Sequence, residues 1–200
     1  MAREIELKFK AQSFDAVLAA LRAAGAVHVR TVLQTDRYYD TAGRSLRGGD
    51  VGLRLRSTKH LEGPQEADER AQLTYKGPAE NHARAKIRRE LQTHVDDAAA
   101  IEALLAALGL AVTMTIQKRR STWRLGGCLV ELDSLPLLGH FIEIEAPDEP
   151  ALEAVERTLA LPGPPIKRHY IDLAEAVCKK LNIDCRTVTF DECGECKERG

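Results

Sequence analysis

The sequence predicts an α+β fold in which an eight-stranded β-barrel closes on itself and helices pack on its outside. Eight segments have the pattern of strands, and most of them alternate charged and apolar residues with a period of two. Stretches with a helical apolar stripe lie between or after these segments. Strand after strand also carries paired charges at positions i and i+2, whereas ordinary solvated strand faces mix in Thr, Ser and Gln.

The strands are expected in eight ranges along the chain. The first is the clearest, because Glu4, Glu6 and Lys8 alternate with three apolar residues. Gly126 and Gly127 separate two later ranges and indicate a hairpin turn. The ranges are Glu4–Phe9, Ala26–Asp40, Val51–Ser57, Ala71–Lys76, Ala85–His94, Val112–Leu125, Cys128–Ser134 and Phe141–Ala146.

Helical patterns occupy four further ranges. In the first of them, Ser13 is the expected N-cap, and Gly25 is the expected residue just past the last turn. The segment His60–Arg70 is polar, contains a Gly-Pro pair and is expected to be a loop. The helices are expected at Ser13–Ala24, Asp96–Leu108, Glu149–Leu161 and roughly Tyr170–Leu181.

Composition and charge exclude several classes of protein. The chain has 200 residues, a length typical of one domain, and its 29 basic and 30 acidic residues give a formal net charge of −1. This balance excludes a polybasic nucleic-acid-binding protein, and no apolar run approaches the ~20 residues of a membrane span. The first residues are acidic where a signal peptide needs an apolar core, so we expect a cytoplasmic protein without nucleic-acid or membrane partners.

The C-terminal residues differ from the rest of the chain. Asp184–Gly200 lacks periodicity, which divides the sequence into a domain at 1–182 and an irregular cysteine-containing tail at 183–200. Cys193 and Cys196 have the C-x-x-C spacing of half a zinc site. Two alternatives stay open, a metal or redox site in the tail and ordinary packing of a cysteine in the core. The cysteines concerned are Cys178, Cys185, Cys193 and Cys196.

The charged strand faces have two possible orientations. A sheet with one solvated face explains alternation in general, and it is the simpler explanation for one or two strands. It explains poorly why so many strands carry charged pairs, because like charges at i and i+2 repel unless something lies between them. A closed barrel with helices on its apolar outer face turns the charges inward, and roughly eight strands enclose room for side chains and one small ligand. We therefore predict a charge-lined tunnel.

The inward charges suit a metal-bound polyphosphate. Cations alone would suit a polyanion, and carboxylates beside them suit hard divalent cations such as Mg²⁺ or Mn²⁺. Arginine binds phosphoryl oxygens with two nitrogens, and a metal ion bridges phosphates to carboxylates, as phosphoryl transfer requires. The basic set is Lys8, Arg54, Arg56, Lys76, Arg88, Lys118 and Arg120, and the acidic set is Glu4, Glu6, Glu90, Glu131, Asp133, Glu143 and Glu145.

Several motifs resemble those of a known family. Glu4-x-Glu6-x-Lys8 is similar to the ExExK signature of the CYTH superfamily, also called triphosphate tunnel metalloenzymes. Further similar segments follow in order over roughly residues 3 to 175, and two of them most resemble the class IV adenylyl cyclase subgroup. The segments are Tyr38–Asp40, Leu53–Arg56, Leu73–Pro78, Arg88–Glu90, Lys118–Arg120, Val130–Asp133, Gly139–Glu145 and Tyr170.

The resemblance implies an antiparallel eight-stranded tunnel, wrapped by helices, that acts on triphosphates with Mg²⁺ or Mn²⁺. Glu131 and Glu90 have an alternative role as partners that hold the basic side chains in place. The implied metal ligands are Glu4, Glu6, Asp133, Glu143 and Glu145, and the implied catalytic residues are Glu4, Glu6, Lys8 and Lys76. The implied phosphate-binding residues are Lys8, Arg54, Arg56, Lys76, Arg88, Lys118 and Arg120.

Three functions compete. Hydrolysis of the terminal phosphate needs only an in-line water, and we favour it. Conversion of ATP to cyclic AMP and pyrophosphate also needs the ribose 3′-oxygen within ~3–3.5 Å of the α-phosphorus. A polyphosphate-binding module without turnover would need no cluster of carboxylates. The expected partner is a small-molecule triphosphate (inorganic triphosphate, thiamine triphosphate or a nucleoside triphosphate), and the expected assembly is a monomer or homodimer.

Overall fold

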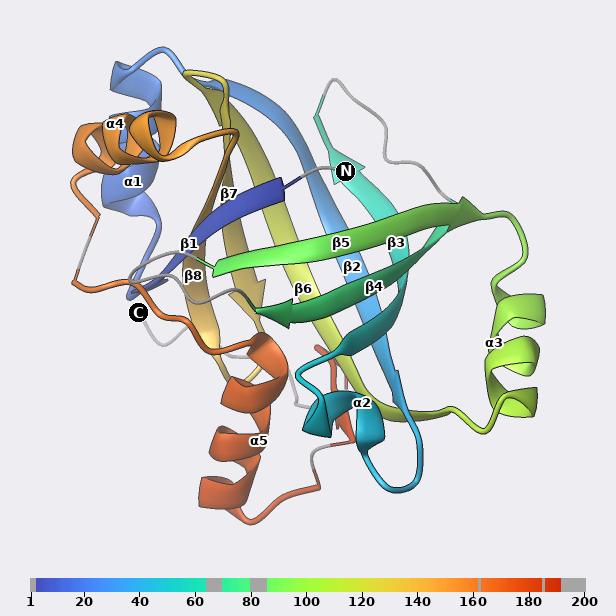
Figure 1. Ribbon diagram of the computed structural model, residues 1–200. Coiled ribbons are helices and arrows are strands. Elements are labelled where there is room, and N and C mark those ends of the chain that lie inside the picture. Colours follow the sequence, from blue (N-terminus) through green and yellow to red (C-terminus); the bar gives the residue numbers. More distant parts are fainter. Residues whose placement is uncertain (1–2, 64–69, 80–85, 162, 185, 192–200) are drawn as a thin grey trace.

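A computed structural model describes residues 3–63, 70–79, 86–161, 163–184 and 186–191. The strands of this described part form one sheet, most of which curls into a barrel (Figure 1). The strands are β1 (Arg3–Ala11), β2 (Val27–Asp40), β3 (Gly52–Glu62), β4 (Ala71–Ala79), β5 (Lys86–Val95), β6 (Ala111–Leu125), β7 (Cys128–Leu135), β8 (Gly139–Ala146) and β9 (Thr187–Val188).

The barrel closes through one long strand pair. The order around it is β2-β3-β4-β5-β1-β8-β7-β6, and β6 pairs back to β2. This closing pair runs from Val27 opposite Arg124 to Asp40 opposite Ala111. All eight neighbours pair antiparallel, which confirms the predicted barrel, while β9 adds a short parallel pairing to β6.

Five helices accompany the barrel in the described part of the chain. They are α1 (Asp15–Ala23), α2 (Ser45–Gly48), α3 (Ala98–Ala107), α4 (Glu149–Leu159) and α5 (Tyr170–Leu181). The sequence analysis does not predict α2, because four residues are too few for a periodic pattern. Asp40 caps it by accepting hydrogen bonds from the backbone nitrogens of Leu46 and Arg47, at 2.9 and 3.0 Å. Among the described helices, none has the length and apolar character needed to cross a membrane.

The N-cap of α1 is a correction. Phe14, and not Ser13, occupies this position, and its side chain makes no capping hydrogen bond. The Ser13 hydroxyl lies one residue earlier and accepts a long hydrogen bond, 3.4 Å, from the nitrogen of Asp15. Gly25 does follow the helix as predicted, with a φ of +71° in the left-handed region that favours glycine.

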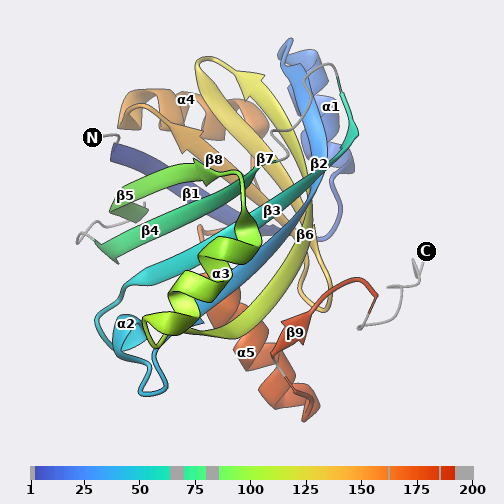
Figure 2. The same ribbon diagram turned by 90° about the vertical axis from the view of Figure 1, so that its right-hand side faces the viewer.

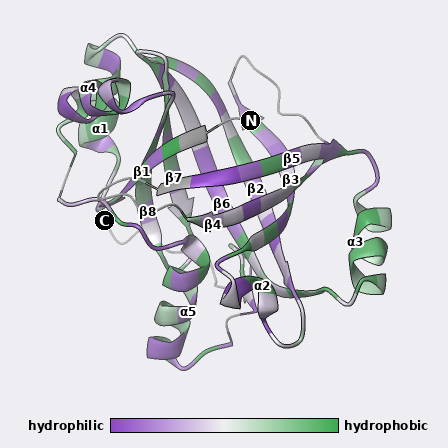
Figure 3. Cartoon of the chain, in the orientation of Figure 1, coloured by the Kyte–Doolittle hydropathy of each residue, from purple (hydrophilic) through white to green (hydrophobic). Residues whose placement is uncertain are grey.

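Two apolar clusters lie on the outer face of the barrel. Leu7 and Ile144 are fully buried between the sheet and helices α1 and α4. Leu55 is buried on the opposite side, where Leu105 of α3 packs against β3 (Figure 2). The rest of α3 is apolar nearly all round (Figure 3), and its Leu104 is 54% exposed. Helices α1, α3 and α4 thus cover the outside of the barrel, as predicted.

Helix α5 packs differently, across one end of the barrel. Because side chains alternate along a strand, Phe141 shares a face of β8 with Glu143, and Ile116 shares a face of β6 with Lys118. The inner faces of these strands are therefore charged over one stretch and apolar over the next, and α5 covers the apolar stretch. The buried cluster there consists of Met114, Ile116, Leu135, Leu138, Phe141, Tyr170, Ala174, Cys178 and Val188.

The segment His60–Arg70 is only partly a loop, which corrects the prediction. Strand β3 continues to Glu62, and His60 pairs with Val32 of β2. Gly63 then turns the chain with a φ of +119°, where a Cβ would lie 2.7 Å from the Cα of Arg30, so glycine is required. The other predicted strand and helix limits agree with the structure to within three residues.

The chain beyond residue 182 contributes to the barrel. Thr187 and Val188 pair with Thr115 and Ile116 of β6, and Val188 is fully buried. Cys178 is buried in the apolar cluster under α5, as one alternative expected. The remaining tail cysteines, Cys185, Cys193 and Cys196, lie outside the described residues, and the domain limit at 182 stays a prediction.

Replacing Val188 by Asp tests whether the segment after α5 belongs to the fold. The change places a charge in the apolar cluster, so the free energy of unfolding should fall by about 3 kcal/mol. Urea unfolding followed by circular dichroism measures it. The matched control is Ile183→Asp, because Ile183 is 46% exposed and should tolerate the charge. Equal stability of the two variants would show that the β9 segment does not contribute.

Candidate active site

The charged strand faces line one cavity inside the barrel, with a volume of about 1170 Å³. They therefore point inward, as predicted, and not to solvent. The cavity is lined by every predicted phosphate-binding residue, Lys8, Arg54, Arg56, Lys76, Arg88, Lys118 and Arg120, and by the carboxylates Glu6, Asp36, Glu90, Glu131, Glu143 and Glu145, among others. Asp133 does not line it, because this residue is fully buried behind Arg120.

The ion pairs of the interior follow from the register of the barrel. Residues directly opposite each other on adjacent strands are close enough for their side chains to meet. Arg120 is opposite Asp133, Lys8 is opposite Glu143, Arg56 is opposite Asp36 and Lys76 is opposite Glu90. Each of these cross-strand neighbours is also an ion pair. The strand pairing that forms the barrel therefore also places each of these charges beside an opposite charge.

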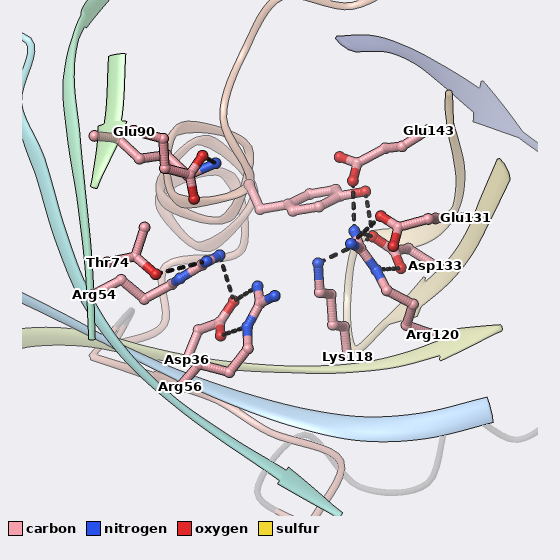
Figure 4. Close-up of polar contacts among 12 residues, drawn as sticks. Asp36, Arg54, Arg56, Thr74, Glu90, Lys118, Arg120, Glu131, Asp133 and Glu143 are labelled. Carbon is pink, nitrogen blue, oxygen red and sulfur yellow. Dashed lines mark hydrogen bonds and ion pairs between the residues drawn. The ribbon is translucent and has the colours of Figure 1, made fainter. Parts of the chain in front are cut away.

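Asp36 organises one wall of the cavity. Its two carboxylate oxygens accept hydrogen bonds from Nε and Nη2 of Arg56, at 2.6 and 2.8 Å, and Nη1 of Arg54 lies 3.6 Å away (Figure 4). Arg54 also donates to the hydroxyl of Thr74 at 3.4 Å. Burial alone would raise the pKa of Asp36, but Arg56 and Arg54 outweigh it and hold the pKa well below its ordinary value. Two arginines are thereby held side by side on this wall.

Arg120 organises the other wall, which Figure 4 shows across from the Asp36 group. Its guanidinium donates to both oxygens of Asp133, at 2.6 and 2.5 Å, and to Glu143 at 2.5 Å, and it also contacts Glu131. Lys118 reaches Asp133 at 3.3 Å. Burial, followed by repulsion from Arg120, lowers the pKa of Lys118 to about 8. This wall therefore holds a permanent cation beside one that titrates near neutral pH.

Lys8 extends this second wall toward β1. Its ammonium nitrogen lies 2.9 Å from Glu143 and 3.4 Å from Glu6. Burial alone would lower the pKa of Lys8, but the two carboxylates overcome it and raise the pKa above its ordinary value. Lys8 is therefore charged throughout the neutral range and shields the carboxylates from each other.

A group of carboxylates lies next to these cations. Oxygens of Glu131, Glu143 and Glu145 come within 4.8 Å of one another. The register places Glu131 opposite Glu143 and Glu6 opposite Glu145, and like charges in such positions repel. Burial and then Glu145 raise the pKa of Glu131 to about 8, although Arg120, which contacts Oε2 of Glu131, lowers it. Three carboxylates with oxygens this close together fit a hard divalent cation, which binds through oxygen.

Arg88 is placed at one end of the cavity and is occupied by protein groups. It donates to the carboxylate of Asp50 at 2.7 Å and to the carbonyls of Asp50 and Gly77, each at 3.1 Å. Its Nη2 also lies 2.9 Å from Nε2 of His169, at the start of α5. Lys76, whose side chain is 30% exposed, pairs with Glu90 at 2.9 Å in the same region.

The predicted site residues thus fall into two groups. The cavity brings together the seven predicted phosphate-binding cations with Glu6, Glu143 and Glu145. Asp133 accepts hydrogen bonds from neighbouring side chains. For Glu4 the structure describes the backbone in β1 but not the side chain. The roles assigned to these residues stay predictions.

Two functional candidates were missed by sequence reasoning. Asp36 shares the period-two face of Gln34 and Tyr38 on β2, but this strand has no charged pair at positions i and i+2, so the pattern alone does not single it out. Tyr170 appears among the matching motifs without a role, because its contacts depend on where α5 docks.

The fold and its interior define a class of protein, a closed antiparallel β-barrel whose cavity is lined by paired cations and carboxylates. The model of the CYTH domain family matches residues 2–161, and the chain belongs to this family. It is a family of triphosphate-tunnel proteins that are metal-dependent and, in general, enzymes.

Individual relatives agree with this assignment. A Methanocaldococcus jannaschii protein, named as a provisional adenylate cyclase, is 26% identical over 142 residues, 71% of this chain and 75% of that protein. The PH1819 protein of Pyrococcus horikoshii has a similar structure, with 26% identity, a TM-score of 0.72 and coverage of 86% and 98% of the two chains. A Hippeastrum protein shares the fold at 18% identity, with a TM-score of 0.66 and coverage of 88% and 96%, and is described as a provisional adenylyl cyclase with a dominant triphosphatase activity.

Replacing Asp36 by Asn tests the wall that it organises. Removing one partner of a buried ion pair leaves arginines uncompensated, so the free energy of unfolding at pH 7 should fall by about 3 kcal/mol. The pKa of Asp36 in the folded protein lies below its ordinary value of 3.8. The ionised carboxylate therefore stabilises the folded protein fully above about pH 3.8, and this contribution is lost as the pH falls further. The difference between variant and wild type should therefore shrink on acidification.

Urea unfolding from about pH 7 down to about pH 3 measures this difference. Asp96→Asn is the control, since this side chain is 88% exposed and the change should alter stability by less than about 0.5 kcal/mol. A difference that stays constant with pH would contradict the role of Asp36.

Proposed function

We propose that the protein hydrolyses the terminal phosphate of a triphosphate with the help of Mg²⁺ or Mn²⁺. The observation that carries the proposal is the contact between two kinds of group in one cavity. The carboxylates Glu131, Glu143 and Glu145 lie directly beside the buried cations Lys8 and Arg120. A polyanion requires the cations, and a divalent metal that accompanies it requires the carboxylates.

The cations suit a short chain of phosphates that lies between two walls. Arg54 and Arg56 face the cavity from one wall, and Lys118 and Arg120 face it from the other (Figure 4). Lys8 lines the cavity beside Glu143. In the structure each of these cations is within reach of a carboxylate or a hydroxyl. Substrate oxygens would replace part of these contacts, so binding exchanges one set of charge-assisted hydrogen bonds for another.

Four carboxylates are the proposed metal ligands. Glu6, Glu143 and Glu145 were predicted from the motifs, and we add Glu131 because its oxygens lie close to those of Glu143 and Glu145. A bound Mg²⁺ or Mn²⁺ would offset negative charge on the transferred phosphoryl group and help to orient the attacking water. For Asp133 we propose a different role, because Arg120, Lys118 and Tyr170 already occupy its oxygens. It orients the two cations instead.

Hydrolysis requires few groups of the protein beyond these cations and carboxylates. The water oxygen forms a bond to the terminal phosphorus, the bond from phosphorus to the bridging oxygen breaks, and the water proton is released to solvent. Catalysis of such a transfer consists mainly of positioning and charge stabilisation. Arg120 and Lys8 would hold the phosphoryl oxygens, while the arginines of the opposite wall would hold the leaving diphosphate.

Cyclisation of ATP is the second candidate. The name of the Methanocaldococcus relative favours it, and a cavity of about 1170 Å³ leaves room for a nucleoside. The Hippeastrum protein is described as a dominant triphosphatase, but it is related to this chain by fold alone. We prefer hydrolysis because cyclisation needs base and ribose held so that the 3′-oxygen reaches the α-phosphorus, at ~3–3.5 Å.

Product analysis tests the proposal directly. The purified protein is incubated with tripolyphosphate and, separately, with ATP, each with Mg²⁺ or Mn²⁺, and ion-exchange chromatography resolves the products. We expect orthophosphate from tripolyphosphate, which has no ribose, and no activity in EDTA. Cyclic AMP and pyrophosphate in equal amounts from ATP, without orthophosphate, would show that cyclisation is the activity.

The variant Glu145→Gln tests the carboxylate group. It removes one anionic ligand while keeping the shape of the side chain, so turnover should fall by about a hundredfold or more. Steady-state hydrolysis of tripolyphosphate measures the loss, and a thermal melt shows whether the barrel is intact. Glu153→Gln is the matched control, since this side chain is 56% exposed on α4. Wild-type turnover in Glu145→Gln would exclude Glu145 as an essential ligand.

A further inference from the structure

The beginning of α5 reaches into the charged interior. The family model matches residues 2–161, so α5 lies beyond the matched range. Even so, His169, Tyr170, Ile171 and Asp172 line the same cavity as the predicted phosphate-binding residues. Tyr170, the first residue of the helix, is only 8% exposed.

Tyr170 contacts three of the charged groups at once. Its hydroxyl donates a hydrogen bond to Oδ2 of Asp133 at 2.9 Å. The ammonium nitrogen of Lys8 lies 4.2 Å from the centre of its ring, and that of Lys118 lies 5.3 Å away. Both distances are within the range of cation–π attraction. One side chain thus joins a carboxylate of β7 to lysines of β1 and β6.

The ring of Tyr170 is itself held in place. It packs edge-on against Phe141 of β8, with ring centres 5.1 Å apart and an angle of 77° between the planes. The helix behind it is tied to α2, because Arg47 donates to Glu175 at 2.7 and 2.8 Å and to Asp172 at 2.9 Å. The contact between Arg88 and His169 fixes the residue just before Tyr170.

We propose that Tyr170 is a positioning residue for the triphosphate, through which α5 completes the site. Its hydroxyl fixes Asp133, which in turn orients Arg120 and Lys118, and its ring holds the two lysine ammonium groups on the same side of the cavity. The cations are therefore already in position when the substrate oxygens bind them. Because fewer side chains have to be ordered on binding, the entropic cost of binding is lower. This inference rests on the proposed function, since it assumes that a triphosphate occupies the cavity.

A merely structural role for Tyr170 makes a different prediction. Its ring belongs to the apolar cluster under α5, so a structural role would change the melting temperature of the variants. It would not change the affinity of the folded protein for a polyphosphate. Affinity measured well below the melting temperature therefore separates the two roles.

The experiment compares Tyr170→Phe with Tyr75→Phe in the full-length protein. Tyr75 is 37% exposed, and its neighbours Thr74 and Lys76 carry the inward face of β4, so its hydroxyl points away from the cavity. Calorimetry measures binding of tripolyphosphate in EDTA, where turnover is prevented, and steady-state assays with Mg²⁺ measure kcat and KM. Circular dichroism shows that each variant is folded at the temperature used.

We expect Tyr170→Phe to weaken tripolyphosphate binding about tenfold, because a hydrogen bond to a charged group is lost. Tyr170→Leu, which also removes the ring, should weaken it further, and Tyr75→Phe should bind like the wild type. Wild-type affinity and kcat in Tyr170→Phe would overturn the inference. A wild-type protein that binds no tripolyphosphate in EDTA and hydrolyses none with Mg²⁺ or Mn²⁺ would instead overturn the proposed function.

Discussion

A charge removed from water is stable in a protein only when an opposite charge or several hydrogen bonds replace the solvent. Arg120 meets this constraint by contacting Asp133 and Glu131 of β7 and Glu143 of β8. The strand register supplies these partners, because Asp133 lies directly opposite Arg120, Glu131 lies two residues from Asp133 on the same face of β7, and Glu143 lies opposite Glu131. A slip of one residue would turn every charge on a strand to the apolar outer face, so the buried charges and the hydrophobic core specify the same register.

The interior is not uniform along the barrel axis. The inner faces of β6 and β8 change from charged residues to apolar ones, and α5 packs where the change occurs. The apolar stretch stabilises the helix by burial, and the helix in turn presents a phenol to the charged stretch. Packing energy at one end of the barrel thereby supports the arrangement of charges in the middle.

Most of the strands could be predicted from the sequence because a period of two is visible in a single chain. The inward direction of the charges followed from the same pattern. The role of Asp133 could not be predicted, since it depends on which carboxylates the neighbouring cations occupy, and this is decided by register and not by motif. Elements as short as α2 and β9 have no period to detect, and Asp36 lies on a strand without a charged pair at positions i and i+2.

The place of β1 has a consequence for the synthesis of the protein. This strand is made first, yet its neighbours are β5 and β8, and β8 ends at Ala146. During translation the edge of β1 that pairs with β8 stays unpaired until β8 has been made, and until then Lys8 lacks Glu143. Contacts between such distant segments form slowly. Closure of the barrel and assembly of the charged interior are therefore one late event. A nascent chain that ends before β8 has neither a closed barrel nor a complete charged interior.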